Sequence, residues 1–195
     1  FGVFKLTKRS ILKYQKINRN SMKTIFWGLF LLLAQTTMAQ EWSNPRIEGY
    51  GKIHYDKNLS FQPDVKKTYK LVFNIDNDAE KTGVNIRLWK IARELNLLKA
   101  AGVPDKNVQI AAVVHGKAIA VSLTDKAYEK RYQKKNPNTE PVKALDNAGV
   151  KLYLCGQTVA GMKIEQDELN PAWEVTLSAL LTLPILESEG YLIVP

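Results

Sequence analysis

The sequence predicts one α/β domain of three layers, α/β/α, in which a mostly parallel sheet of about five strands is covered by helices on both faces. Two observations predict this class. Strand-like apolar runs alternate along the chain with helical patterns, which is typical of parallel strands joined by right-handed crossovers. Residues 108–114 form a continuous apolar run, as expected of a strand that is buried on both faces. Residues 40–195 number 156, which is enough for a single core of this kind.

The first 39 residues are expected to lie outside this domain, because they contain seven Lys or Arg and no acidic residue. Residues 22–39 have a basic start, a short apolar core and small residues at Thr37 and Ala39, the pattern of a signal peptide cleaved after Ala39. The apolar core has ten residues, fewer than the about 20 that a membrane-spanning helix needs. We therefore expect no stable membrane span after cleavage; an uncleaved anchor is the alternative.

Residues 1–21 precede Met22 and are interpreted as an upstream segment that is untranslated or lies outside the working protein. With cleavage after Ala39, the mature chain is predicted to be periplasmic or secreted. Residues 40–67 contain prolines, glycines and little periodicity, so they are expected to form an extended N-terminal arm with a short edge strand at about residues 51–55. The domain itself is assigned to residues 68–195.

The first half of the domain has clear periodic signals. Residues 68–75 read as a strand, and the turn-like sequence Asp76-Asn-Asp-Ala follows it. Apolar residues then recur at three- and four-residue steps from Val84 to Leu98, which predicts a helix over residues 81–101 that stops before Pro104.

The second half of the domain is punctuated by glycine and proline. After the strand at 108–114 we expect a short helix at 117–123, a helix end running into a mobile polar loop at 124–141, a helix at 142–148 and a strand at 150–154. Pro171 suits the first turn of a helix, so residues 172–189 are expected to be helical, with a kink or break at Pro184. Residues 191–194 are the expected closing strand.

Composition excludes several classes of function. The whole chain has a net charge of +9, but without the first 39 residues it has 21 basic and 19 acidic residues, so a nucleic-acid partner is not expected. The basic run at residues 126–135 is interpreted as a solvated face, with a docking patch for an acidic partner as the alternative. Glycine-rich nucleotide loops and a Gly-x-Ser-x-Gly elbow are missing from the sequence, and no cofactor is expected. Two histidines and one cysteine cannot form a structural zinc site within one subunit, so no metal is expected.

Two predicted strand ends carry the candidate chemistry. His115-Gly116 follows the strand at 108–114, and Cys155-Gly156-Gln157-Thr158 follows the strand at 150–154. In a parallel sheet both ends reach the same edge, which is where open α/β folds bind ligands. Backbone N–H groups after the cysteine can favour its thiolate, and a histidine can assist it. The alternatives are that Cys155 is an inert buried residue and that His115 merely holds the strand end.

Several segments together resemble the DsrE/DsrF-like family over about residues 69–195. They are Val113-Val-His-Gly-Lys-Ala118, Asn136-Pro-Asn138, Gly149-Val-Lys-Leu-Tyr-Leu-Cys-Gly-Gln-Thr158, Leu169-Asn-Pro171 and Gly190-Tyr-Leu-Ile-Val-Pro195. The resemblance implies a compact α/β/α domain that forms homo- or hetero-oligomers. It also implies that Cys155 matches a cysteine that carries sulfur as a persulfide in sulfur oxidation or tRNA thiolation.

The chain departs from this family pattern in two ways. Sulfur-relay members usually have Arg-Gly shortly after the cysteine, whereas Val159-Ala-Gly-Met-Lys163 follows here. Those members also work in the cytoplasm, whereas this chain carries a predicted export signal, so their partners cannot be assumed.

The leading hypothesis is an exported sulfur carrier, at most sulfurtransferase-like, in which Cys155 accepts sulfane sulfur and His115 tunes it. Gly116, Gly156, Gln157 and Thr158 are the predicted ligand-binding residues. The expected partners are further copies of the chain and a sulfur donor or acceptor, either a protein or a small sulfur species. The alternatives are a non-catalytic oligomeric module that binds a small ligand at the same crevice, and a thiol redox sensor that pairs with another molecule.

Overall fold

The computed structural model describes residues 41–194 of the chain, so the predicted upstream segment and signal peptide lie outside the described residues. The strands are β1 (Tyr69–Ile75), β2 (Glu80–Lys81), β3 (Val84–Asn85), β4 (Val108–Val114), β5 (Lys151–Cys155), β6 (Glu174–Thr176) and β7 (Leu192–Val194). The α-helices are α2 (Ile86–Ala100), α3 (Asp125–Tyr132), α4 (Thr139–Asn147), α5 (Gly156–Gly161) and α6 (Ala179–Ser188). Short 3-10 helices span Asp105–Asn107, Gly116–Ser122 and Gln166–Glu168.

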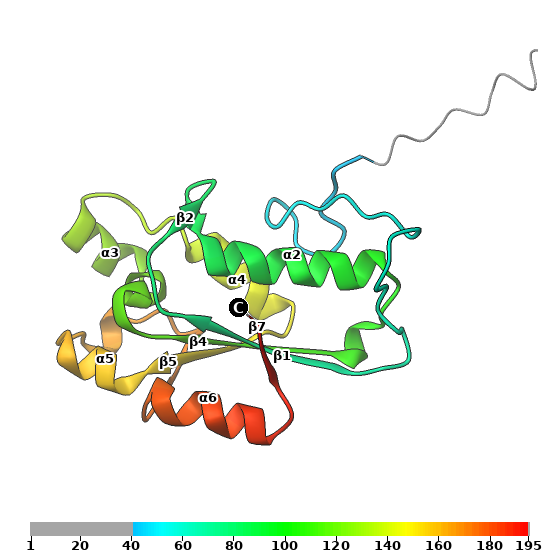
Figure 1. Cartoon of the computed structure of the whole chain (residues 1–195). Helices are drawn as coiled ribbons and strands as arrows, with labels where there is room; N and C mark the ends of the chain where they lie inside the picture. Colours follow the sequence, from blue (N-terminus) through cyan, green and yellow to red (C-terminus); the bar gives the residue numbers. More distant parts are fainter. Residues whose placement is uncertain (1–40, 195) are drawn as a thin grey trace, which may run out of the picture. The chain divides into compact units, whose positions relative to one another are not determined.

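The central sheet has five strands in the order β6-β5-β4-β1-β7, and every neighbouring pair is parallel. Strands β1 and β4 pair over their full length, from Tyr69 opposite Val108 to Ile75 opposite Val114. Helices lie above and below this sheet (Figure 1). The predicted α/β/α class with a parallel sheet of about five strands is therefore confirmed.

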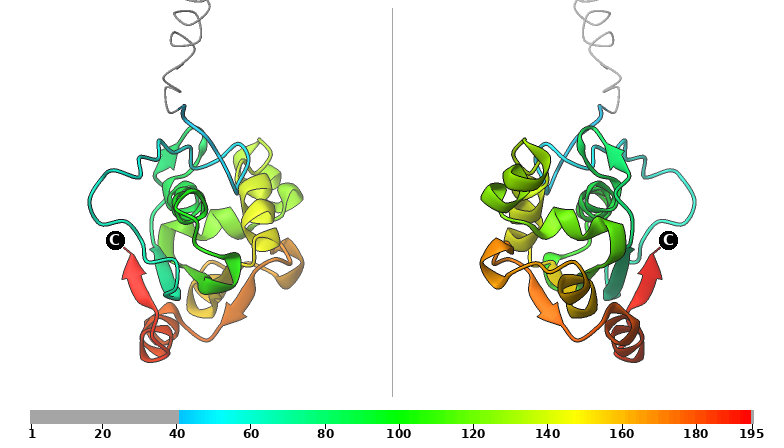
Figure 2. Two further views of the ribbon diagram at one scale, coloured as in Figure 1. Left: turned by 90° about the vertical axis from the view of Figure 1, so that its right-hand side faces the viewer. Right: turned by 90° about the vertical axis from the view of Figure 1, so that its left-hand side faces the viewer.

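The two faces of the sheet bury different cores. On one face, Phe73, Ala112 and Leu154 pack with residues of α2, α3 and α4 in the larger core. On the other face, Val72, Val113 and Cys155 pack against α6 and Tyr191 in a smaller core. The end-on views show the same asymmetry, with α6 as the helix beneath the sheet (Figure 2). Cys155 thus belongs to the thinner side of the domain.

Residues 41–68 wrap over α2 without forming a regular strand; Ile53 makes one isolated antiparallel bridge with Ser43. The buried Asn96 side chain of α2 holds this segment. Its Oδ1 accepts from the N–H groups of Arg46 and Ile47, both at 2.8 Å, and its Nδ2 donates to the carbonyls of Tyr50 and Gly51.

The start of α2 differs from the sequence expectation. Residues 80–85 form a hairpin of β2 and β3 instead of the first turns of a helix, and the helix begins at Ile86. Thr82 and Gly83 both have positive φ angles, 52° and 81°, as a tight hairpin turn of the primed type requires. Asn85 then caps the helix by accepting a hydrogen bond from the N–H of Arg87 at 2.9 Å.

The expected single helix over residues 172–189 is also wrong. Residues 174–176 form edge strand β6, and α6 begins only after Ser178, whose Oγ accepts from the N–H of Leu180 at 3.2 Å. Of the kink or break expected at Pro184, the break is absent: Pro184 lies inside α6, which continues to Ser188. Proline has no N–H, so the carbonyl of residue 180 lacks its helical donor.

The loop between α3 and α4 is anchored by buried asparagines, in contrast to the mobile loop expected there. Asn136 Nδ2 donates to the carbonyl of Leu123 at 2.8 Å, and the N–H of Asn138 donates to Asn136 Oδ1 at 2.9 Å. Asn138 Oδ1 in turn accepts from the N–H of Asn85 at 2.8 Å. The loop therefore ties α4 to the start of α2.

Candidate functional site

The carboxyl edge of the sheet brings polar residues from neighbouring strands together. His115 directly follows β4 and Cys155 ends β5, and these strands are paired with Val114 opposite Leu154. Thr176 lies opposite Cys155 on β6, and Asn74 lies near the end of β1. Because side chains alternate along a strand, Asn74, His115 and Cys155 all project toward the α6 side of the sheet.

The Cys155 thiol is buried, with a relative exposure of 4 % for the residue. Burial alone raises the pKa of this thiol, but hydrogen bonds to the sulfur outweigh burial and lower the pKa below its ordinary value. The groups beside the sulfur that lower its pKa are the Ala179 N–H, the hydroxyl and N–H of Thr158, and the Gln157 N–H. The surroundings therefore favour the thiolate, which is the nucleophilic form of cysteine.

The donors come from the starts of two helices. Cys155 directly precedes α5, so the N–H groups of Gln157 and Thr158, in the first turn of that helix, lie beside the Cys155 sulfur. Ala179 is the first residue of α6 and reaches the sulfur from the other side. Of the predicted binding residues, Gln157 and Thr158 are thus placed at the thiol.

The two glycines of the predicted site allow close backbone contacts. A Cβ atom on Gly156 would lie 2.6 Å from the Thr176 carbonyl oxygen, so only glycine fits between β5 and β6 there. Gly116 has a φ of +57°, and a Cβ on it would lie 3.3 Å from the Asp76 carbonyl oxygen. Both glycines shape the edge through their backbone.

Thr158 links the two strand ends directly. Its Oγ1 accepts a hydrogen bond from the Gly116 N–H at 3.3 Å, while its hydroxyl also interacts with the Cys155 sulfur. A hydroxyl can accept one bond and donate another, so both contacts are compatible.

The His115 imidazole makes a hydrogen bond toward β1 and not toward Cys155 on β5. Its Nε2 lies 2.8 Å from Asn74 Oδ1 on β1, whereas β5 is the neighbour of β4 on the opposite side. An amide oxygen only accepts hydrogen bonds, so this pair forms with the tautomer in which Nε2 donates. The imidazole is not among the hydrogen-bond partners of the Cys155 sulfur. The structure thus places His115 at the same edge but not in contact with the thiol through a hydrogen bond.

Sequence reasoning missed Ala179 and Asn74. Ala179 was hidden inside the helix expected over residues 172–189, and only the capping residue Ser178 signals the true helix start. Asn74 is the one uncharged polar side chain between the apolar residues Phe73 and Ile75, which could have marked it as facing a site.

The part of the chain that the structure describes contains neither a metal-binding cluster nor a membrane-spanning helix. Within residues 41–194, no group of three or more His, Cys, Asp or Glu side chains is arranged to hold a metal ion. Every helix in the same range is too short or too polar to span a bilayer. The arrangement at the sheet edge supplies one nucleophilic sulfur, with N–H and hydroxyl groups beside it that can stabilise an anion.

Comparison with known proteins shows the fold and the family of the chain. Among curated proteins none matches the chain. A solved structure from Methanobacterium thermoautotrophicum, the protein of unknown function MTH1491, shares the fold with a TM-score of 0.51 and 21 % identity, over 65 % of this chain and 97 % of its own. The family model for DsrE/DsrF-like proteins matches residues 70–195, which include all five strands of the sheet except the first residue of β1 and also every predicted site residue. The chain that carries this thiol at its sheet edge therefore belongs to the DsrE/DsrF-like family.

Proposed function

We propose that the protein is a sulfur carrier in which Cys155 takes up a sulfane sulfur as a persulfide and passes it to an acceptor. The observation that carries this proposal is the place of the only cysteine in the chain, which is buried at the carboxyl edge of the sheet beside N–H and hydroxyl groups that lower the pKa of its thiol. Membership of a family related to sulfur relay supports it. The site has no base hydrogen-bonded to the sulfur, which suits a carrier better than a hydrolytic enzyme.

The proposed loading step needs no external oxidant. The Cys155 thiolate attacks a sulfane sulfur of a polysulfide, and a new S–S bond forms while the bond to the remaining polysulfide breaks. The departing polysulfide, shorter by one sulfur atom, keeps the electron pair of the broken bond. In the unloading step an acceptor thiolate attacks the outer sulfur, and Cys155 leaves as the thiolate. The donors from Ala179 and Thr158 stabilise the anion before and after each step.

Loading also requires access to the buried sulfur. Residues 177–179 lie beside it, since the Ala179 N–H contacts the sulfur and the Leu177 carbonyl accepts from Gln157 Nε2 at 3.2 Å. We propose that this short segment moves aside when the sulfur donor binds.

The test is to incubate the purified protein with polysulfide and to record its intact mass before and after treatment with cyanide or a reductant. We expect wild type to gain the mass of one or more sulfur atoms reversibly and Cys155→Ser to gain none. Full loading of Cys155→Ser, or no loading of wild type, would overturn the proposal.

The burial of Cys155 favours a second candidate, a non-catalytic module that binds a small ligand at the same edge. In that case the thiol is a core residue that reacts with iodoacetamide only after unfolding. Comparing alkylation of the native and the urea-unfolded protein separates the two candidates, because a carrier thiol must react in the native state.

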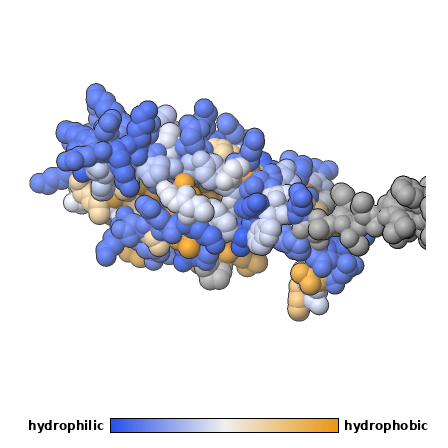
Figure 3. Space-filling model, turned by 90° about the horizontal axis from the view of Figure 1, so that it is seen from above, coloured by the Kyte–Doolittle hydropathy of each residue, from blue (hydrophilic) through white to orange (hydrophobic). Residues whose placement is uncertain are grey.

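We also propose that the chain assembles with further copies of itself through the surface around α6. This apolar α6 surface consists of exposed side chains of β6, α6, β7 and the β6–α6 loop: Val175, Leu177, Leu180, Leu181, Ile185, Leu192 and Ile193. In α6 itself the only charged residue is Glu187. The opposite face, which carries α2, is largely hydrophilic (Figure 3). Exposed apolar patches mark interaction surfaces, and a predominantly apolar one suits a second copy of itself.

Export is the remaining part of the proposal, and it rests on the composition of residues 22–39. Fractionation of cells that produce the full chain, followed by mass determination of the mature protein, tests it. A protein that stays in the cytoplasm with residues 22–39 attached would contradict export.

A further inference from the structure

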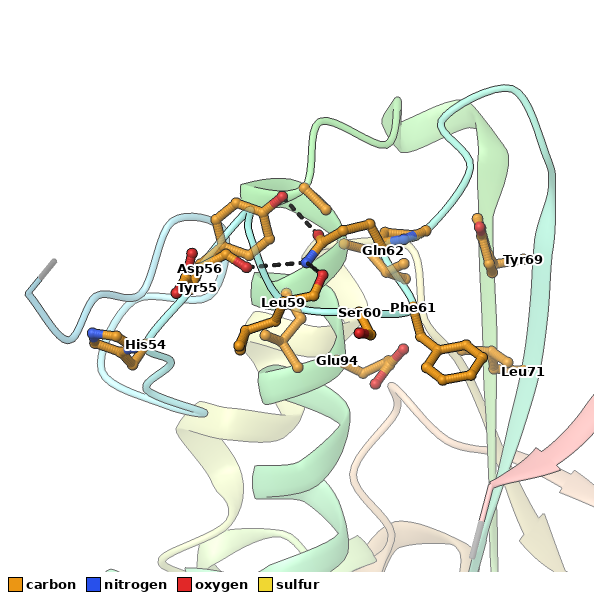
Figure 4. A pocket seen from close by; sticks show the side chains of 14 residues that line it. His54, Tyr55, Asp56, Leu59, Ser60, Phe61, Gln62, Tyr69, Leu71 and Glu94 are labelled. Carbon is orange, nitrogen blue, oxygen red and sulfur yellow. Dashed lines mark hydrogen bonds between the residues drawn. The ribbon is translucent and has the colours of Figure 1, made fainter.

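A pocket lies at the end of the sheet opposite Cys155, between the loop at residues 54–63, the start of β1 and the second half of α2 (Figure 4). Its volume is about 550 Å³, within the range of small-molecule sites in proteins. Apolar side chains dominate the walls, notably Leu59, Phe61, Leu71 and Leu97. The polar residues of the lining include Glu94, which points into the pocket from α2.

The loop over the pocket is held in shape by the side chain of Gln62. Its Oε1 accepts from the Tyr55 hydroxyl at 2.9 Å, and its Nε2 donates to the carbonyls of Asp56 and Leu59, both at 3.0 Å. The amide group thus links three positions of the loop. A loop fixed by its own polar contacts provides a preformed wall, which reduces the ordering cost of binding.

The apolar side chains of this loop have little to pack against in the free protein. Phe61 is fully exposed and has a φ of +57°, which is unfavourable for a bulky side chain. Leu59 is 63 % exposed. An apolar ligand in the pocket would cover both side chains.

Glu94 is the charged group of the inner wall, and it lacks a counter-ion. Among residues 41–194 its carboxylate makes no hydrogen bond and no ion pair, and burial raises its pKa. The other ionisable side chains on the lining are His54, Asp56 and two tyrosines, so no lysine or arginine faces it there. A desolvated carboxylate without a partner is unfavourable, and a cation that binds beside it removes this penalty.

We propose that this pocket binds a small apolar molecule that carries a primary ammonium group. The ammonium pairs with the Glu94 carboxylate, and the hydrocarbon part lies between Phe61, Leu59 and Leu97. Charge complementarity selects an amine over a fatty acid, because Glu94 and Asp56 give the lining a negative charge. The site is separate from Cys155 and does not depend on sulfur chemistry.

The test is isothermal titration calorimetry of the full chain at neutral pH with three probes of equal chain length: n-octylamine, 1-octanol and octanoate. We expect octylamine to bind at least tenfold more tightly than octanol, and octanoate to bind more weakly than octanol. Glu94→Gln keeps the size of the side chain and should bind octylamine and octanol equally. Glu129→Gln on α3, outside the pocket, is the matched control and should retain the amine preference.

A second variant keeps the result interpretable if Glu94→Gln alters folding. Phe61→Ser changes a fully exposed side chain, so the fold should persist while all three probes bind more weakly. Equal affinity of wild type for octylamine and octanol would overturn the proposal. So would tighter binding of octanoate, unchanged amine binding by Glu94→Gln, or the absence of saturable binding.

Discussion

Thr158 is the residue that connects the two halves of the candidate site. It accepts from the Gly116 N–H after β4, and its hydroxyl and N–H both contact the Cys155 sulfur after β5. A change at this one side chain therefore alters the thiol without touching the core.

Replacement of Thr158 by valine is expected to raise the pKa of Cys155, because it removes a hydroxyl donor from the thiolate and keeps the shape of the side chain. The rate of iodoacetamide alkylation against pH should shift to higher pH in the variant. His115→Gln is the comparison, and it should shift the profile less, since the imidazole bonds to Asn74 and not to the sulfur. A larger shift in His115→Gln than in Thr158→Val would contradict the assigned roles.

Gly156 is expected to tolerate no side chain. Gly156→Ala places a Cβ 2.6 Å from the Thr176 carbonyl oxygen, so β5 and β6 must separate, and the free energy of unfolding should fall by about 1–3 kcal/mol. Gly161→Ala, at the last residue of α5, meets no atom within 4 Å and is the matched control. Urea unfolding of both variants checks this; equal midpoints would show that the edge adjusts freely.

At the scale of elements, one side chain of α2 fixes the preceding segment of the chain. Asn96 is fully buried and satisfies two N–H groups and two carbonyls of residues 46–51. These backbone groups have no strand or helix of their own to pair with. The position of residues 41–68 on α2 therefore depends on this amide.

Asn96→Ala should lower the free energy of unfolding by about 2–4 kcal/mol, because it leaves buried backbone groups without partners. Limited proteolysis should at the same time cut residues 41–68 faster. Asn107→Ala, which removes a single exposed hydrogen bond to Val65 at 3.1 Å, serves as the control and should change stability by less than about 1 kcal/mol. Loss of stability in both variants alike would argue against a special role for Asn96.

The link between α3 and the segment before β6 should make stability depend on pH. Arg131 forms two hydrogen bonds with Glu168, at 2.9 and 2.7 Å, and this partner lowers the pKa of the Glu168 carboxyl to about 2. The stabilisation of the folded state by this pair is fully present above pH 4.5, the ordinary pKa of a glutamate, and it is lost as the pH falls toward about 2. The difference in urea midpoint between wild type and Glu168→Gln should shrink over that interval. A difference that stays constant from neutral pH to about pH 2 would contradict this assignment.

The elements with strong periodicity could be predicted from the sequence, and the short elements could not. Strands β1, β4, β5 and β7 follow apolar runs and were predicted within one or two residues. The hairpin before α2 was missed because Val84 continues the helical spacing of Leu88 and Ile91, whereas the Thr82-Gly83 turn fixes the local backbone. Strand β6 has three residues, too few for an alternating pattern to be recognised.

For the candidate site as well, local patterns predicted the strand ends but not the contacts that depend on tertiary packing. The strand ends placed His115 and Cys155 at one edge, since this depends only on parallel pairing. The contact of Ala179 with the sulfur depends on where β6 ends and α6 starts, which tertiary packing decides. The Asn74 partner of His115 likewise follows from the pairing of β1 with β4.

At the scale of the whole molecule, the two faces of the sheet are covered unequally. The larger core lies under α2, α3 and α4, whereas α6 covers the other face and leaves its outer side chains exposed. Leu180 is 85 % exposed and Ile185 is 55 % exposed. This imbalance is the basis for the proposed self-association.

Leu180→Glu should convert the proposed assembly into monomers, because it places a charge within the apolar α6 surface. Light scattering coupled to size-exclusion chromatography gives the mass directly. Val65→Glu introduces the same charge at an exposed position outside that surface, and it should leave the mass unchanged. A wild-type protein that is monomeric at every concentration tested would contradict self-association.

The position of β7 beside β1 affects when the domain can finish folding during its synthesis. The last strand pairs with β1, with Leu192 opposite Leu71, so the sheet joins the two ends of the domain sequence. During synthesis, β1 leaves the ribosome long before its outer neighbour β7, and its outer edge stays open until β7 emerges. Contacts between such distant parts of a chain form slowly. Folding of this domain is therefore completed only after β7 has left the ribosome, and loss of residues 192–194 would leave β1 unpaired on that side.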